Sequence, residues 1–271
     1  MSTTPDVEAI VQEVLAKKKY RALDIDLVTF IASTEAKKRA TLKEAVKATT
    51  NKLHQVAGAY FKEQPDYASY LQDLELLPDN FSHDQSRQFC LKLMQEHAST
   101  RERLPILPEF YATLFADMQP ITSLLDLACG FNPLAIHWMT LDKEARYYAS
   151  DIFEDMSSFL NSFFDHFRLN GKASVCNLLT HIPQEKVQVA LLLKTLPCLE
   201  QADKESARRI LNGIHAQYVI VSFPVRSISG KEKGMLAHYS SQFESLLGDL
   251  GWHYRKFLFE SELAYRIEKD I

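Results

Sequence analysis

Ser123-Leu-Leu-Asp-Leu-Ala-Cys-Gly-Phe-Asn-Pro-Leu-Ala135 is the stretch that decides the fold of this chain of 271 residues. It predicts a short buried strand, a tight turn at Gly130 and a helix that begins near Pro133, because proline suits the first turn of a helix. Such a unit directs free backbone N–H groups toward a cleft above a sheet. An ordinary turn between a strand and a helix explains the same residues, since one glycine motif is a weak signal.

The next expected strand favours a nucleotide site. Arg146-Tyr-Tyr-Ala-Ser-Asp151 is apolar and ends in an acid, about 20 residues after the glycine turn, where a carboxylate can bind the hydroxyls of a ribose. Residues 130–135 lack the G-x-G-x-x-G pattern, so bulky side chains stand where a pyrophosphate would approach the backbone. A nucleoside without phosphates fits better, and S-adenosylmethionine (SAM) is the candidate. Asp126-x-Ala-x-Gly130 resembles motif I of class I SAM-dependent methyltransferases.

Charge is distributed unevenly along a chain whose net charge is only −4. Residues 17–62 contain 11 Lys/Arg and 4 Asp/Glu, whereas residues 63–100 contain 2 Lys/Arg and 7 Asp/Glu. This asymmetry fits a protein with one face that binds a polyanion. Two solvated helical faces of opposite sign explain it equally well.

Cysteine spacing and hydropathy indicate the cellular setting. Cys90, Cys129, Cys176 and Cys198 lie far apart without a C-x-x-C pair, which favours neither a zinc site nor a disulfide framework. No apolar run approaches the roughly 18 residues of a membrane span, and the first residues lack the apolar core of a signal peptide. We therefore expect a soluble, cytoplasmic monomer with no metal and no membrane partner.

Two patterns divide the chain, and they predict an all-helical N-terminal domain over 1–105 and a methyltransferase domain over 106–271. Apolar residues at helical spacing predict helices over 7–19, 24–34, 41–57, part of 65–82, 86–97 and 108–118. Strands are then expected at 122–128, 146–151, 173–178, 188–193, 217–223, 252–259 and 262–268, with helices at 133–140, 154–169, 201–214 and 235–247. This order predicts an α/β fold, the seven-stranded doubly wound sheet of class I methyltransferases.

Polar residues follow the expected strands, at the edge where such sheets bind ligands. They are Asn132, Asp151, Asn177, Lys194 and Arg226. Each has an alternative role: Asp151 also fits a cap of the helix that starts near Glu154, Asn177 fits a turn, and Lys194 fits a solvated charge.

Two further segments carry possible chemistry. Pro197-Cys198 is similar to the nucleophile motif of cytosine-C5 methyltransferases, although a lone cysteine in an apolar run more often packs in the core. His97-Ala-Ser-Thr-Arg-Glu-Arg103 is densely polar, and Arg103 suits the methionine carboxylate of SAM; a helix cap without function is the alternative.

Several blocks together resemble the aminoglycoside-resistance 16S ribosomal RNA (guanine-1405-N7) methyltransferase family. They are Leu53-His-Gln-Val-Ala-Gly-Ala-Tyr60, His97–Arg103, Leu125–Leu134, Leu193-Lys-Thr-Leu-Pro197 and Val221-Ser-Phe-Pro-Val-Arg-Ser-Ile-Ser-Gly-Lys-Glu-Lys-Gly-Met235. The resemblance implies SAM as cofactor, guanine N7 in the assembled 30S subunit as target, and an N-terminal domain that docks on rRNA. This sequence departs from the family at Phe131, where Leu is usual, and at Asn177, where Asp is common.

The resemblance also implies site residues. SAM contacts are expected from Tyr60, Phe61, His97, Ala98, Ser99, Arg103, Ala128, Gly130, Asp151, Asn177, Leu178 and Leu193. We further predict that Phe223 and Arg226 position the target base, and that rRNA is bound by Lys17, Lys18, Lys19, Arg21, Lys194, Lys231 and Lys233.

The expected reaction needs no general base, because guanine N7 presents a lone pair and carries no proton. Proximity and orientation supply the catalysis. Two alternatives stay open at this point: a methyltransferase that acts on another RNA position or on a small molecule, and a ribosome-binding factor that retains SAM without turnover.

Overall fold

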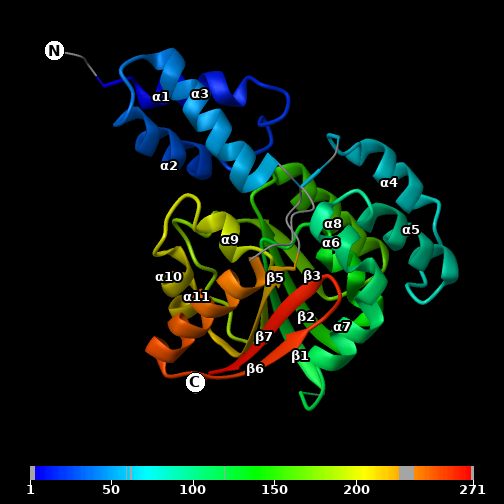
Figure 1. Ribbon diagram of the computed structural model, residues 1–271. Coiled ribbons are helices and arrows are strands. Elements are labelled where there is room, and N and C mark those ends of the chain that lie inside the picture. The colour runs from blue at the N-terminus through cyan, green and yellow to red at the C-terminus, as the bar shows by residue number, and fades with distance from the viewer. Residues whose placement is uncertain (1–3, 59, 62, 119, 226–234, 270–271) are drawn as a thin grey trace.

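A seven-stranded mixed sheet forms the centre of the molecule in a computed structural model, which describes residues 4–58, 60–61, 63–118, 120–225 and 235–269 (Figure 1). The strand order is β3-β2-β1-β4-β5-β7-β6, and β7 runs opposite to the other strands of this sheet. The strands are β1 (Ile121–Leu127), β2 (Leu141–Asp151), β3 (Gly171–Val175), β4 (Val187–Leu193), β5 (Ala216–Pro224), β6 (His253–Leu258) and β7 (Glu262–Glu268). This topology confirms the expected class I methyltransferase fold.

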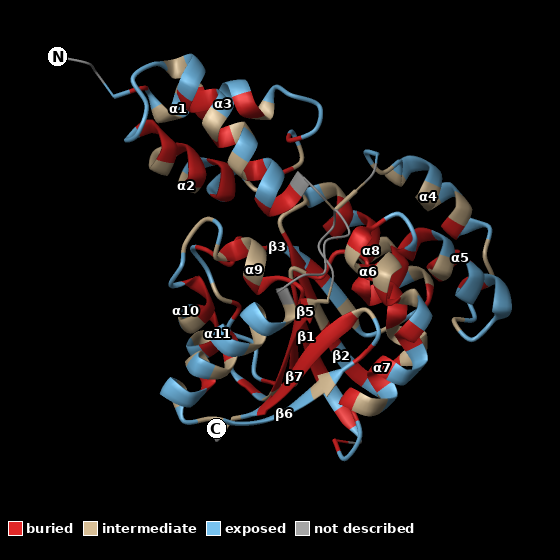
Figure 2. Ribbon diagram, in the orientation of Figure 1, coloured by how far each residue is buried: buried red, intermediate tan, exposed pale blue. Residues whose placement is uncertain are grey.

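Helices cover both faces of the sheet (Figures 1 and 2). On one face lie α9 (Leu196–Leu199), α10 (Ser206–Gly213) and α11 (Met235–Leu250). On the other lie α4 (Tyr67–Glu75), α5 (Asp84–Met94), α6 (Ala98–Arg103), the short helix η2 (Leu104–Ile106), α7 (Leu107–Leu114) and α8 (Glu154–His166). The central strands are buried almost throughout, as parallel strands between two helical layers must be, whereas the edge strand β6 is mostly exposed.

The first helices form a separate lobe, which we call the N-terminal lobe (residues 4–58). It contains α1 (Val7–Leu15), α2 (Ile25–Ala36), α3 (Leu42–Leu53) and the π-helix η1 (His54–Gly58). The side chains of Asp6, Asp24 and Thr41 accept hydrogen bonds from the first turns of the three α-helices and so set where each begins. The three helices pack on one another, whereas α4 packs on α8, and α5 packs on the 3₁₀-helix η3 (Asn132–Trp138). The segment expected as one helical domain therefore contains two groups of helices with different packing partners.

Backbone hydrogen bonds join this lobe to the turn after β2. The Asp24 amide donates to the carbonyl of Ile152 at 2.8 Å, and the Glu154 amide donates to the carbonyl of Ala22 at 2.9 Å. The lobe is thus fixed beside Asp151, the last residue of β2.

The helix expected after the glycine turn differs from the prediction. It is a short 3₁₀-helix, η3 (Asn132–Trp138), and β2 begins three residues later at Leu141 instead of at residue 146. A 3₁₀-helix rises about 2.0 Å per residue against 1.5 Å for an α-helix, so few residues cover the distance back to the sheet. The helix expected over 201–214 is shorter, since α10 covers only Ser206–Gly213, and a separate short helix, α9, precedes it at Leu196–Leu199.

Candidate functional site

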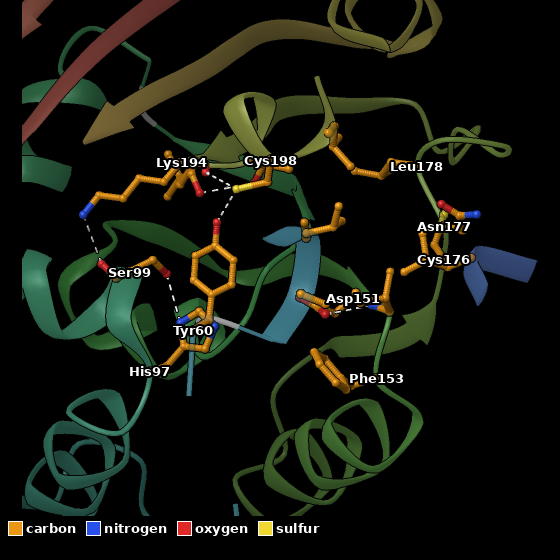
Figure 3. A pocket seen from close by; sticks show the side chains of 18 residues that line it. Tyr60, His97, Ser99, Asp151, Phe153, Cys176, Asn177, Leu178, Lys194 and Cys198 are labelled. Atoms are coloured by element: carbon orange, nitrogen blue, oxygen red, sulfur yellow. Dashed lines mark hydrogen bonds between the residues drawn. The ribbon is translucent and has the colours of Figure 1, made fainter. Parts of the chain in front are cut away.

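A cavity lies above the carboxyl ends of β1, β2 and β4, at the edge where the sequence places the polar residues. Among its lining residues are most of those expected to contact SAM: Tyr60, His97, Ser99, Ala128, Asp151, Asn177, Leu178 and Leu193. Figure 3 shows Asp151, Asn177 and Leu178 toward one end and Ser99, Lys194 and Cys198 toward the other. The cavity therefore has two chemically different ends.

The carboxylate of Asp151 is buried and fixed by backbone donors. One oxygen accepts from the Gly130 amide at 2.8 Å, and the other accepts from the Ile152 amide at 2.7 Å. Burial raises the pKa of Asp151 to about 6, although the backbone N–H groups act in the opposite direction. The capping alternative is wrong, because Phe153 is the N-cap residue of α8 and no side chain caps that helix.

Gly130 lies where no larger residue fits. Its φ angle is +52°, and a Cβ atom there would stand 2.6 Å from Cε1 of His97. His97 is buried, and burial first, then nearby cations, lowers its pKa to about 3, so the imidazole is neutral. Gly130 therefore does not line the cavity but brings its amide to Asp151, with the His97 ring packed behind it.

Asn177 has one satisfied and one unsatisfied end. Its side-chain oxygen accepts from the Leu179 amide at 3.0 Å, whereas its buried Nδ2 has no hydrogen-bond partner in the part of the chain that the structure describes. The oxygen is therefore already used, and the free group at this wall of the cavity is a donor. A ring nitrogen of adenine can accept a hydrogen bond from it.

Asp126 supports the glycine turn from below the cavity. Its carboxylate accepts from Tyr147 Oη at 2.6 Å and from Asn132 Nδ2 at 2.9 Å. Burial raises the pKa of Asp126 to about 7, against the opposing effect of these two hydrogen bonds. This motif residue thus holds the chain after Gly130 and does not line the cavity.

Lys194 differs from its expected role as an rRNA ligand. It is 5% exposed, and its ammonium lies 2.9 Å from Glu102 and 3.3 Å from Glu262. The expectation of a surface cation is wrong because two carboxylates distant in sequence draw the side chain into the wall of the cavity. Its backbone φ is +60°, an uncommon value for a residue with a side chain and one that clusters at functional sites.

Arg103 is fully buried beside Lys194. Its guanidinium donates to both oxygens of Glu262, at 3.0 and 2.8 Å, and to Asn132 Oδ1 at 2.9 Å. Burial would raise the pKa of Glu262, but the charges of Arg103 and Lys194 outweigh it and lower that pKa. Glu262 is therefore an ionised carboxylate between two cations. Arg103, expected to contact SAM, is not among the residues that line the cavity and shares the carboxylate of Glu262 with Lys194, which is.

The thiol of Cys198 lies in the cavity beside the hydroxyl of Tyr60, whose ring stacks on His97. Burial raises the pKa of the Cys198 thiol, which disfavours the thiolate that a cytosine-C5 mechanism needs. Cys198 is therefore a wall residue and a poor nucleophile. Phe61 packs edge-on against His97 and Phe131 outside this cavity, and Ala98 is held by its amide, which donates to the Tyr60 carbonyl at 2.8 Å.

Phe223 also differs from its predicted role. It is 3% exposed, its ring stacks on Tyr239 with 5.3 Å between centroids, and it packs edge-on against Phe243. Because neighbouring rings already cover it, Phe223 supports an aromatic cluster and offers no face to a base. Lys17, Lys18, Lys19 and Arg21 are exposed after α1, as expected. Arg226, Lys231 and Lys233 lie outside the described residues.

Sequence reasoning missed several wall residues. Leu27 and Val56 come from the N-terminal lobe, and Phe153 and Thr195 from the ends of β2 and β4. The first two are ordinary apolar residues of amphipathic helices, so nothing in their local sequence marks them. Thr195 directly follows Lys194, so the same argument from polar residues after the expected strands could have identified it.

Two negative findings concern the described ranges only. No helix there is long and apolar enough to cross a membrane. No group of three or more His, Cys, Asp or Glu side chains there is arranged to hold a metal ion.

The residues at this cavity fit SAM part by part. Asp151 offers acceptors for ribose hydroxyls, Asn177 offers a donor for adenine, and the ammonium of Lys194 near Ser99 suits a carboxylate. A doubly wound sheet of this strand order with such a site defines a SAM-dependent methyltransferase.

Comparison with known proteins gives the family. Residues 16–265 match the family described as "Ribosomal RNA methyltransferase (FmrO)", and the chain belongs to this family. It is 33% identical over 265 residues to the 16S rRNA (guanine(1405)-N(7))-methyltransferase of Micromonospora echinospora, covering 97% of each chain. The solved structure of the 16S rRNA methylase RmtB is similar with a TM-score of 0.80 and 28% identity, over 98% of this chain and 99% of that one.

A second solved structure bears on the cofactor. The 16S rRNA methyltransferase RmtF, in complex with S-adenosyl-L-homocysteine (SAH), has a TM-score of 0.80 and 28% identity, over 97% of this chain and 98% of that one. The expected family and the expected cofactor are confirmed.

Proposed function

We propose that this protein transfers a methyl group from SAM to N7 of guanine 1405 in 16S rRNA, within the assembled 30S subunit of the cytoplasm, and so confers aminoglycoside resistance. The observation that carries the proposal is the cavity over the carboxyl edge of the sheet in a chain whose relatives are named for this reaction. The exposed basic run 17–21 supports a polyanionic substrate. We expect the protein to act as a monomer.

The reaction is an in-line displacement. The bound sulfonium supplies the methyl group, which forms a bond to N7 as its bond to sulfur breaks, leaving a cationic methylated guanine and SAH. N7 carries no proton, so no side chain has to remove one. Asp151 and Asn177 hold the adenosine part, and Gly130 fixes Asp151. Orientation of this kind is worth roughly 7–11 kcal/mol of the barrier.

Base recognition has to come from residues other than the buried ring of Phe223. Tyr239, half-buried and stacked on Phe223, lines an open groove beside α9 and offers a ring there. We propose Tyr239 for contact with rRNA, and we keep Arg226, Lys231 and Lys233 as predicted phosphate ligands.

The test incubates the protein and labelled SAM with purified 30S subunits or with free 16S rRNA, and then maps the methylated base. Label at N7 of guanine 1405 in subunits only is the expected result. Label on another nucleotide would show a different RNA methyltransferase, and no label with intact SAH binding would show a factor that binds without turnover. The Asp151→Ala variant is the control for dependence on this cavity.

A further inference from the structure

Glu262, the first residue of β7, joins three elements beside the cavity, next to the lining residue Lys194. It is 0% exposed, and its carboxylate accepts two hydrogen bonds from Arg103 on α6 and one from the hydroxyl of Ser222 on β5. Its oxygen also lies 3.3 Å from the ammonium of Lys194 after β4. One carboxylate thus faces two buried cations.

This cluster lies at the end of the cavity away from the adenosine residues. Lys194 and Ser99 line the cavity, and Lys194 donates to the Ser99 carbonyl at 3.4 Å (Figure 3). With ribose at Asp151 and adenine at Asn177, the amino-acid part of SAM extends toward Lys194. A carboxylate at that end meets the ammonium of Lys194, which is the pairing that charge-assisted hydrogen bonds favour.

Glu262 is the carboxylate that the two cations share. A buried charge whose partner is removed is strongly destabilised, and Lys194 would then turn wholly to Glu102, whose side chain is 34% exposed. Ser222 fixes the arrangement from below, because its hydroxyl donates to Glu262 and accepts from the Lys194 amide at 3.1 Å. We propose, as an extension of the proposed function, that Glu262 is a positioning residue: anchored by Arg103, it holds Lys194 in the cavity wall where the carboxylate of SAM binds.

The test compares two ligands that differ in the amino-acid part. Titration calorimetry measures the affinity of the Glu262→Gln variant for SAH and for 5′-methylthioadenosine, which lacks the carboxylate. We expect SAH to bind at least about tenfold more weakly and methylthioadenosine to change less than about twofold. Equal losses for both ligands would show a merely structural role. Unchanged or tighter SAH binding would show that Glu262 only competes for the cations. Either result overturns the proposal.

Two further variants guard the interpretation. Ser222→Ala removes one hydrogen bond to Glu262 without changing any charge, and it replaces Glu262→Gln if that variant does not fold. A loss of affinity for SAH but not for methylthioadenosine then supports the proposal. An equal loss for both ligands, or no loss, overturns it. Glu244→Gln is the matched control, because Glu244 is paired with Lys256 and Tyr265 at a distance from the cavity. We expect it to bind both ligands as the unmodified protein does.

Discussion

The carboxylate of Asp151 links ligand binding to pH. With a pKa raised to about 6 by burial, it gains a proton in mildly acidic solution and then accepts hydrogen bonds from ribose less well. We expect SAH to bind about tenfold more weakly at pH 5 than at pH 7, measured by calorimetry. Asp151→Asn is expected to bind weakly at both pH values. A flat profile for the unmodified protein would contradict this role.

Unfolding does not account for such a loss. Since the folded-state pKa of Asp151 lies above its ordinary value of 3.8, ionisation favours the unfolded chain, and the free energy of unfolding falls as pH rises from about 4 to about 6. Acid therefore weakens binding while it favours the folded state at this residue. Asp126, with a pKa raised to about 7, also titrates nearby, so Asp126→Asn serves to separate the two carboxylates.

Gly130 is the second residue of the site at which we expect a substitution to be costly. Gly130→Ala places a methyl group on the His97 ring and a side chain at a φ of +52°. We expect the free energy of unfolding to fall by about 1–3 kcal/mol, measured by denaturant titration, together with weaker SAH binding. Gly248→Ala, within α11 and with open space around its Cβ, is the control and is expected to be neutral or slightly stabilising. Equal stability of the two variants would refute the argument.

At the scale of elements, the basic run after α1 is the part expected to meet rRNA. Lys18 and Arg21 are exposed there, and reversing both charges removes attraction to phosphates. The double variant Lys18→Glu/Arg21→Glu is expected to bind 30S subunits more weakly and to keep its SAH affinity. The slope of log affinity against log salt concentration is expected to fall by the amount that corresponds to about two phosphate contacts. Filter binding at several salt concentrations measures this.

The matched control changes the same charge at the opposite edge of the sheet. Lys143 and Lys172 are exposed near the amino ends of β2 and β3, away from the cavity. If Lys143→Glu/Lys172→Glu weakens 30S binding as much, net charge and not the basic run determines docking.

The sequence allowed most elements to be predicted, for identifiable reasons. Apolar runs such as Val189–Leu193 mark buried strands, and Asp24 and Thr41 mark where helices begin. The 3₁₀-helix after Gly130 and the π-helix after α3 were not predicted as such, because apolar periodicity does not distinguish these helix types from α-helices. Lys194 was wrongly predicted to be an exposed rRNA ligand. Its burial depends on Glu102 and Glu262, which no local sequence pattern connects to it.

At the scale of the whole molecule, the N-terminal lobe and the sheet share one binding site. Leu27 and Val56 of the lobe line the cavity, and the Asp24 amide is bonded to Ile152 beside Asp151. We expect SAH to slow hydrogen exchange at the Asp24 and Glu154 amides, measured by NMR or mass spectrometry. The Ala45 amide, within the first turn of α3, is the reference and is expected to exchange at an unchanged rate. An unaffected Asp24 would show that the lobe does not respond to the ligand.

The pair formed by Arg103 and Glu262 joins residues that stand 159 positions apart in the chain. Contacts between such distant segments tend to form late, after the local elements have assembled. The ligand then meets a complete pocket only on the native side of the folding barrier, so its binding slows the escape from the native state and leaves the rate of refolding unchanged. The cofactor therefore makes this protein longer-lived under denaturing stress, without making it quicker to regain its structure.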